Sequence, residues 1–189
     1  MQKNTIRTGY LSKIQSYKEK DLIKVVTGLR RSGKSTLLEQ YRSALIKEGV
    51  PKKRILFYNF ELPENYINKT WDQIYFEIKK KLHETEMSYI FLDEVQNISL
   101  FEKLVDGLYA SNNTDVYITG SNAFLLSSEL ATLLSGRYIE ISILPFSFKE
   151  YLIAREIEVN NKYLNFEALF FDYVNETSLP KGVDLREGG

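Results

Sequence analysis

A chain of 189 residues, 43% of them hydrophobic and 13% aromatic, is long enough for one packed globular core and short for two. It has no cysteine, which excludes disulfides and thiolate chemistry. Its single histidine, His83, argues against a zinc site or a Ser-His-Asp triad. Its net charge is zero, no apolar run is long enough to span a bilayer, and the first residues lack a signal-peptide core, so we expect a cytoplasmic protein with no membrane partner.

The first strand, loop and helix carry the most specific motif. Residues 21–27 form a short β-branched run suited to a buried strand, and residues 28–35 (GLRRSGKS) match the phosphate-binding loop pattern G-x-x-x-x-G-K-[ST]. Apolar residues then recur at helical spacing until Gly49 and Pro51, which signal a helix end. This order is the context that the motif requires, so the sequence predicts binding of a nucleoside triphosphate.

Each residue type in the loop has a physical role. Gly28 and Gly33 let the backbone fold tightly around a phosphate chain. Lys34 supplies a charge for the β- and γ-phosphates, and the hydroxyl of Ser35 is a ligand for Mg²⁺. The free N–H groups at the start of the helix add partial positive charge. We assign nucleotide binding to Gly28, Leu29, Arg30, Arg31, Ser32, Gly33, Lys34, Ser35 and Thr36.

The rest of the chain alternates strands and helices. Further strands are expected at residues 54–60, 89–92, 116–119 and 138–144, and helices at residues 71–83, 101–108 and 123–134. This alternation predicts an α/β fold in which helices cover both faces of a parallel sheet, with the strands that are apolar throughout at its centre.

The pattern changes after Pro145. Residues 148–157 and 166–174 predict two amphipathic helices, and the last five residues are polar and glycine-rich. We therefore place a core at residues 1–145 and a helical extension at residues 146–189, which would be a truncated lid or the start of a further domain.

Two acids follow the strand at residues 89–92. Ligands bind off the C-terminal ends of strands in open α/β sheets, so Asp93 is placed to hold Mg²⁺ opposite Ser35. Glu94 can orient and deprotonate a water for attack on the γ-phosphate. Because kinases must exclude water, an acid beside the metal ligand favours hydrolysis over phosphate transfer.

Polar residues near two other strand ends are further candidates. Ser121 and Asn122 follow the strand at residues 116–119 and can hold the attacking water, although turn formation alone also explains Gly-Ser-Asn. Asn59, at the end of the second strand, can hydrogen-bond Glu94 and hold it inactive.

Arg137 stands just before the fifth strand. It is either an arginine finger, which stabilises charge in the phosphoryl-transfer transition state, or a surface residue after a glycine helix stop. The sequence leaves open whether it would reach its own nucleotide or that of a neighbouring copy, and with this it leaves open whether the protein forms a homo-oligomer.

The charges are unevenly distributed along the chain. Residues 1–54 carry 14 Lys and Arg against 4 Asp and Glu, and the remaining 135 residues carry 11 against 21. A basic segment can mark a nucleic-acid surface, but no aromatic-interleaved basic motif accompanies this one. We therefore favour the alternative that folding interleaves the two halves and that the phosphates use some of the loop's cations.

Five motifs in order resemble a known family. They lie at residues 28–38, 91–96, 119–122, 134–137 and 144–151. Together they resemble the AAA-like ATPases of bacteria and archaea that have an AAA-type N-terminal domain and usually a further C-terminal domain. The resemblance covers roughly residues 7–155. It implies a P-loop ATPase core with a three-layer sandwich and a parallel sheet in the order 5-1-4-3-2.

The resemblance also bears on what this chain lacks. Members of the family are about twice as long, and their C-terminal part, of uncertain role, includes DNA-binding or nuclease-like parts. The chain is therefore expected to be an N-terminal fragment. For the lid arginine that senses nucleotide in AAA proteins, Arg155 is the nearest candidate.

These observations predict an Mg²⁺-dependent ATPase domain coupled to an effector domain beyond this chain. ATP is favoured over GTP because the guanine-specific motif Asn-Lys-x-Asp is missing. Partners would be ATP and ADP, and nucleic acid or a protein through the further domain. A nucleotide-controlled switch with little hydrolysis is the alternative, and a kinase is less favoured.

Overall fold

The computed structural model describes residues 7–30, 32–120, 134, 136–145, 147–155, 157 and 164–177. They divide into two compact units, one of residues 7–143 and one that holds the described residues from Leu144 onward. Each unit is described by itself.

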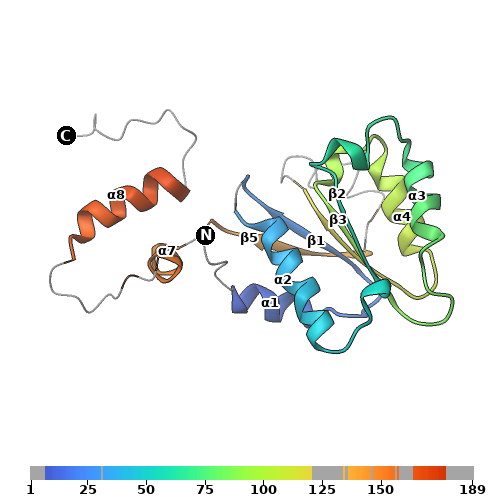
Figure 1. The fold of residues 1–189 in the computed structure, drawn as a ribbon, viewed down its shortest axis with the longest axis horizontal. Coiled ribbons are helices and arrows are strands. Elements are labelled where there is room, and N and C mark those ends of the chain that lie inside the picture. The colour runs from blue at the N-terminus through green and yellow to red at the C-terminus, as the bar shows by residue number, and fades with distance from the viewer. Residues whose placement is uncertain are drawn as a thin grey trace. The chain divides into compact units, whose positions relative to one another are not determined.

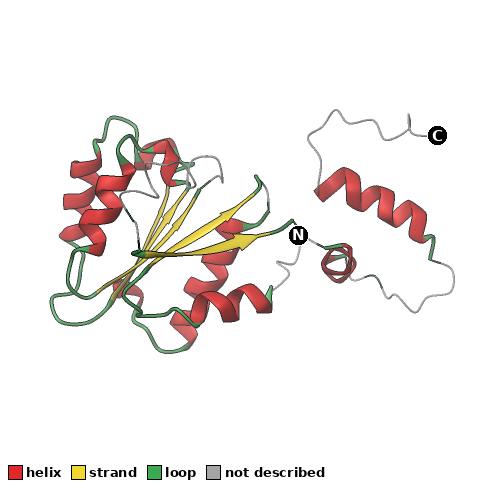
Figure 2. Cartoon of the chain, turned by 180° about the vertical axis from the view of Figure 1, so that it is seen from behind, coloured by secondary structure: helices red, strands yellow, loops and turns green. Residues whose placement is uncertain are grey.

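The larger unit is a parallel sheet with helices on both faces (Figures 1 and 2). Its strands are β1 (Ile23–Gly28), β2 (Ile55–Asn59), β3 (Ser88–Asp93), β4 (Thr114–Thr119) and β5 (Tyr138–Ile143). Its helices are α1 (Thr8–Gln15), α2 (Lys34–Lys47), α3 (Trp71–Lys79) and α4 (Phe101–Tyr109), with 3₁₀ turns η1 (Lys52–Arg54), η2 (Pro63–Asn65) and η3 (Val95–Asn97). The strand order is β2-β3-β4-β1-β5 and every neighbouring pair is parallel. Read from the other edge, this order is 5-1-4-3-2, so the predicted fold class is confirmed.

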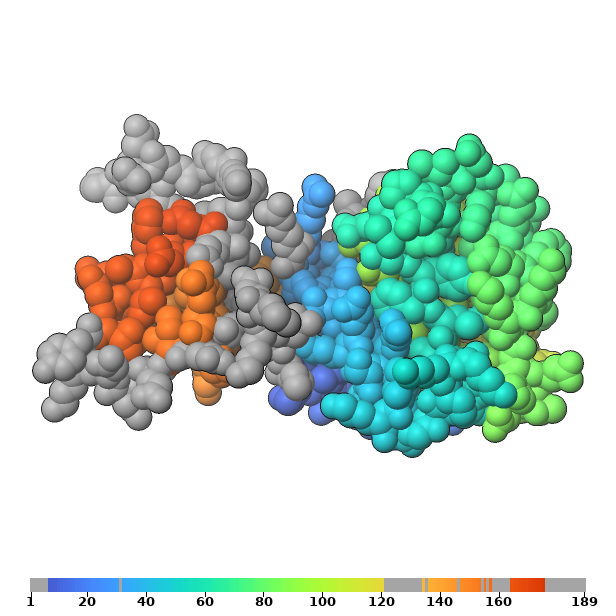
Figure 3. Space-filling view, viewed as in Figure 1, coloured from blue at the N-terminus to red at the C-terminus, as the bar shows by residue number. Residues whose placement is uncertain are grey.

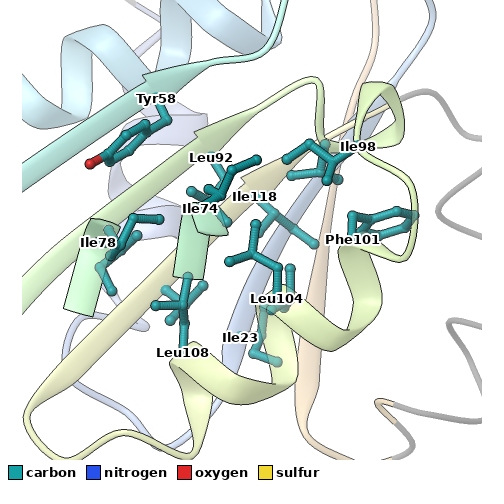
Figure 4. Close-up of a cluster of buried hydrophobic side chains, with 14 of the residues drawn as sticks. Ile23, Tyr58, Ile74, Ile78, Leu92, Ile98, Phe101, Leu104, Leu108 and Ile118 are labelled. Atoms are coloured by element: carbon teal, nitrogen blue, oxygen red, sulfur yellow. The ribbon is translucent and has the colours of Figure 1, made fainter. Parts of the chain in front are cut away.

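Helices α3 and α4 cover one face of the sheet through a hydrophobic core (Figure 4). From the helices this core takes Ile74, Ile78, Leu104 and Leu108, all at most 1% exposed. The sheet contributes Ile23, Leu92 and Ile118, among others. Leu104 and Leu108 are four residues apart, so they share one stripe of the helix and bury together.

Helices α1 and α2 cover the opposite face. Buried residues of this second core come from α2, from α1 and from the other side of the strands: Ile14, Val26, Leu37, Leu38, Tyr41, Leu45, Phe91 and Tyr117. The switch of face between Val25 and Val26 follows the two-residue period of a strand. In the space-filling view, the light-blue α2 lies at the surface of this face (Figure 3).

Element boundaries differ from the sequence prediction at several ends. The helix expected to reach His83 ends at Lys79, and the His83 ring nitrogen Nδ1 instead accepts the backbone N–H of Glu86 at 3.1 Å in the turn that follows. Helix α1 was not predicted, although its Ile14 is fully buried. The helix expected at residues 123–134 lies outside the described residues except for its last residue.

The smaller unit contains helices α7 (Phe148–Ala154) and α8 (Phe166–Thr177), which correspond to the two predicted amphipathic helices. A capping box starts α7, where the Ser147 hydroxyl accepts the Glu150 N–H at 3.2 Å and the Glu150 carboxylate accepts the Ser147 N–H at 2.8 Å. Phe148 of α7 meets Phe170 and Tyr173 of α8 edge to face, each at 5.4 Å between ring centroids. Among the helices that the structure describes, none combines the length and the hydropathy that a bilayer crossing needs.

Candidate functional site

The phosphate-loop motif connects β1 to α2 on the side of the sheet where the parallel strands have their C-terminal ends. Gly28 ends β1 with φ +154°, and a Cβ at this position would lie 2.5 Å from the carbonyl oxygen of Ile143 and 2.7 Å from Ser32 Oγ. Gly33 has φ +92° and forms the N-cap of α2, in the left-handed region that glycine adopts without strain. The backbone of the loop therefore requires both glycines at the positions where the motif has them.

Lys34 is the first residue of α2 and is 5% exposed. Its Nζ donates to the carbonyl oxygens of Leu29 at 3.3 Å and Gly28 at 3.4 Å. The same nitrogen lies 3.6 Å from Oε1 of Glu94. The cation thus lies between the phosphate loop and the acid that follows β3. Of the remaining loop residues, Leu29 and Arg30 are exposed, Ser35 and Thr36 are half-buried, and Arg31 lies outside the described residues.

Asp93 ends β3 and is fully buried. Its Oδ1 accepts a hydrogen bond from the Thr119 hydroxyl at 2.5 Å, and its Oδ2 has no hydrogen-bond partner among the described residues. Burial raises the pKa of Asp93, while the hydroxyls of Thr119 and Ser35 lower it. The effect of Ser35 on this pKa places its hydroxyl near the Asp93 carboxyl, so the two predicted metal ligands lie close together.

Glu94 follows in the left-handed conformation, with φ +55°. Its backbone N–H donates to the Thr119 hydroxyl at 2.9 Å, so this one hydroxyl accepts from Glu94 and donates to Asp93. The Glu94 carboxylate divides its two oxygens, since Oε2 accepts from Nε2 of Gln96 and Oε1 faces Lys34. The two acids that the sequence pairs are thus fixed by the last residue of β4, the strand next to β3.

Sequence reasoning assigned no role to three residues of this site, namely Thr119, Gln96 and Arg7. Arg7 precedes α1, is 8% exposed, and donates from Nη1 to the carbonyl oxygen of Ser32 in the loop at 3.3 Å. Its guanidinium also lies 4.4 Å from the ring centroid of Tyr10. A basic residue 21 positions before the loop gives no local signal of this contact. For Thr119, its position at the end of a buried strand was the available signal.

Arg137 does not lie at this edge of the sheet. Its carbonyl oxygen accepts the N–H of Ile23, the first residue of β1, at 2.8 Å. The loop begins at Gly28, which is the last residue of β1. The length of β1 separates Ile23 from Gly28 by about 17 Å, more than an arginine side chain spans. Its guanidinium donates to Asp106 of α4 at 3.1 Å. The geometry therefore rules out that Arg137 reaches the loop of its own chain.

Four other candidates have different outcomes. Ser121 and Asn122 lie outside the described residues. The predicted bond from Asn59 to Glu94 is not found among the described residues, because Oδ1 of Asn59 accepts the backbone N–H of Glu61 at 2.8 Å and Gln96 takes its place at Glu94. Arg155 belongs to the smaller unit, next to the ring of Tyr151.

The residues at this edge fit a magnesium nucleotide chemically. Two buried oxygens, Ser32 Oγ in the loop and Asp93 Oδ2, have no hydrogen-bond partner among the described residues. Oxygen atoms of a carboxylate and a hydroxyl are ligands that Mg²⁺ prefers, and it commonly takes one or two protein ligands beside phosphate oxygens and waters. At Gly33 no described atom would lie within 4 Å of a Cβ, so the backbone there is open to a phosphate chain.

A phosphate loop between the first strand and the following helix, with acids at the end of the third strand of a 5-1-4-3-2 sheet, defines a P-loop domain. Comparison with known proteins makes the assignment narrower. Residues 20–152 match the family model described as "AAA domain", and the chain belongs to this family.

Sequence relatives come from bacteria and archaea. The chain is 43% identical over 178 residues to an uncharacterized protein of Haemophilus influenzae, covering 94% of this chain and 44% of that protein. It is 36% identical over 155 residues to the uncharacterized protein MJ1544 of Methanocaldococcus jannaschii, covering 82% of this chain and 34% of that protein. The chain thus spans less than half the length of these relatives.

Among solved structures, the crystal structure of Saccharomyces cerevisiae RIF2 is similar with a TM-score of 0.51. The match covers 91% of this chain and 72% of RIF2, at 12% sequence identity. At this identity the likeness shows the fold alone.

Proposed function

We propose that this chain binds ATP with Mg²⁺ at the C-terminal edge of its sheet and hydrolyses the γ-phosphate. The observation that carries the proposal is the convergence of Lys34, Asp93 and Glu94. Lys34 Nζ lies 3.6 Å from Glu94 Oε1, and one Thr119 hydroxyl bonds both the Asp93 carboxylate and the Glu94 backbone N–H. A cation for phosphate, a ligand for metal and a base for water then share one site. Membership of the AAA domain family supports this reading.

Each residue would have a distinct role. The loop amides and Lys34 bind the phosphate oxygens, and Ser35 and Asp93 hold Mg²⁺, which when bound neutralises charge that develops on those oxygens. Glu94 accepts a proton from the attacking water. Ser121 and Asn122, which follow β4, remain the proposed residues that orient this water.

Two substitutions test the proposal. Lys34→Ala removes the buried cation and should weaken ATP binding by about 100-fold or more, since charge-assisted bonds to phosphate are among the strong ones. Glu94→Gln keeps the shape and polarity of the side chain, so ATP should still bind while turnover falls by about 10²–10⁴-fold. Titration calorimetry with Mg-ATP and a phosphate-release assay measure the two effects.

A matched control is Lys52→Ala, which removes the same charge from an exposed position in η1. Unchanged ATP affinity in Lys34→Ala would refute nucleotide binding by the loop. Unchanged turnover in Glu94→Gln would remove Glu94 from the role of base. Tight ATP binding with no measurable turnover of the wild type would favour the alternative, a nucleotide-controlled switch.

The position of Arg137 supports a second element of the proposal, action on the nucleotide of a neighbouring copy. Arg137 is 54% exposed and pairs with the 41% exposed Asp106, an ion pair of a kind that contributes little to stability. If it serves a neighbour, specific activity should rise with protein concentration, and Arg137→Ala should lower kcat by up to about 10³-fold.

Mixing provides the sharper test of that element. Arg137→Ala and Lys34→Ala subunits, each inactive alone, should regain activity together, because one supplies the intact loop and the other the arginine. Concentration-independent activity, with Arg137→Ala fully active, would leave Arg137 as a surface residue.

The role of the whole protein is a further proposal. Because the matched relatives are more than twice as long as the matched segment, we propose that this domain is coupled to an effector beyond it, with nucleic acid or a protein as partner, in the cytoplasm. Turnover of the full-length protein, with and without DNA, tests this. Stimulation by DNA would support a nucleic-acid partner, and no response would turn the search to proteins.

A further inference from the structure

Within the described residues, two side chains interact with the Glu94 carboxylate: Gln96 through a hydrogen bond and Lys34 through an ion pair. Both chain neighbours of Gln96 fix the backbone around it. Val95 is fully buried in the core beneath α4, and the Asn97 amide donates to the carbonyl oxygen of Phe60 at 2.8 Å. The turn η3 therefore holds Gln96 in place and leaves its side chain to the site.

The chemistry of the pair determines how the amide is oriented. An ionised carboxylate accepts hydrogen bonds and donates none, so the Gln96 group that meets Glu94 is the Nε2 amide NH₂. Its other polar atom, Oε1, is buried and has no hydrogen-bond partner among the described residues. A buried amide oxygen without a partner destabilises the fold, so stability alone gives no reason for glutamine here.

From this arrangement we infer that Gln96 is a positioning residue for hydrolysis, which occupies Oε2 of Glu94 and leaves Oε1 as the oxygen that takes the proton from water. Oε1 is the oxygen on the side of the phosphate loop, since it lies 3.6 Å from Lys34 Nζ. Without the bond to Gln96, the carboxylate can rotate about its last side-chain bond, and neither oxygen is held toward the water. The inference rests on the proposed hydrolysis at this site.

The test is Gln96→Met in the full-length protein, because methionine has a similar length and shape but makes no comparable hydrogen bond. We expect kcat to fall by about 10- to 100-fold. The dissociation constant for ATP should stay within about twofold, and the midpoint of thermal unfolding should not fall, since a buried unpaired oxygen is removed. A purely structural role predicts the opposite, a lower unfolding midpoint with little change in kcat.

The chain offers a matched control. Gln15 donates from Nε2 to Oε1 of Glu48 at 2.7 Å, the same kind of bond on an exposed surface. Gln15→Met should leave both kcat and ATP affinity unchanged.

A double variant shows whether Gln96 acts through Glu94. In a Glu94→Gln background, Gln96→Met should cause no further loss of kcat, because the group that it positions is already gone. A further 10-fold loss in that background would overturn the inference, as would full kcat in the single variant. Either result leaves the proposed hydrolysis intact if Glu94→Gln is impaired, whereas a wild type without turnover refutes hydrolysis itself.

Discussion

Two buried aspartates, near opposite ends of the same sheet, differ in how completely their carboxylates are bonded. Asp115, near the start of β4, has an ion pair with Lys24 at 2.6 Å, and its other oxygen accepts from the Tyr117 hydroxyl at 2.8 Å and the Glu19 N–H at 2.7 Å. Asp93, at the end of β3, bonds Thr119 through one oxygen and has the other unpartnered among the described residues. Although both aspartates are buried, Asp115 uses both oxygens within the protein, whereas Asp93 keeps one oxygen that a ligand can bind.

The largest expected effect tests this comparison at Asp115. In Asp115→Asn, the neutral amide cannot neutralise Lys24, and an NH₂ group in place of Oδ2 can accept from neither Glu19 nor Tyr117. Lys24 is fully buried, so an uncompensated charge remains in the core. We expect the free energy of unfolding to fall by about 3–5 kcal/mol, as measured by urea denaturation.

The matched change at the other end is Asp93→Asn. The new Oδ1 still accepts from Thr119, and a carboxyl whose pKa burial raises is replaced by a neutral group. The unfolding free energy should change by no more than about 1 kcal/mol, because the substitution removes an ionisable group from the interior but leaves, among the described residues, an unpartnered NH₂ where the unpartnered oxygen was. The proposed hydrolysis should be lost. Equal destabilisation by the two substitutions would show that the comparison is wrong.

The smallest effect on stability is expected for a partly exposed carboxylate, that of Glu77, which serves as a reference for the two buried aspartates. Hydrogen bonds from Lys69 and then Lys81 lower the pKa of Glu77 from 4.5 to about 2. Because the folded-state pKa lies below the unfolded one, the stabilisation is present above about pH 4.5 and is lost as the pH falls toward 2.

Glu77 is 36% exposed, so its contribution should be only about 0.2–1 kcal/mol and should shrink with salt. The pH dependence of unfolding, compared between wild type and Glu77→Gln, measures it. If Glu77→Gln lowered the free energy of unfolding as much as Asp115→Asn, the number of hydrogen bonds to a carboxylate, and not its burial, would determine how much these ion pairs stabilise the fold.

The sequence predicted those parts of the site that are local in the chain. The loop lies between one strand and the next helix, and the two acids directly follow a buried strand, so period and motif were enough to find them. Contacts between distant segments were not predictable in this way. Thr119 bonds Asp93 across 26 positions, Arg7 bonds Ser32 across 25, and Lys24 bonds Asp115 across 91.

Arg137 is a different case, because a signal existed. A residue that directly precedes a strand of a parallel sheet lies at the edge opposite the C-terminal strand ends. The predicted parallel fold therefore already implied that Arg137 is remote from its own phosphate loop. Gln96 lacked such a rule, since its side-chain direction depends on the left-handed turn at Glu94.

The position of β4 sets the spacing between the strand ends that carry the phosphate loop and the two acids. Since β4 separates β1 from β3, the loop and the acids emerge two strand spacings apart, about 10 Å. The strand between them, β4, supplies one hydroxyl to the candidate site, that of Thr119. The same strand therefore both fixes the two acidic residues through hydrogen bonds and sets the distance from their strand to the strand that carries the phosphate loop.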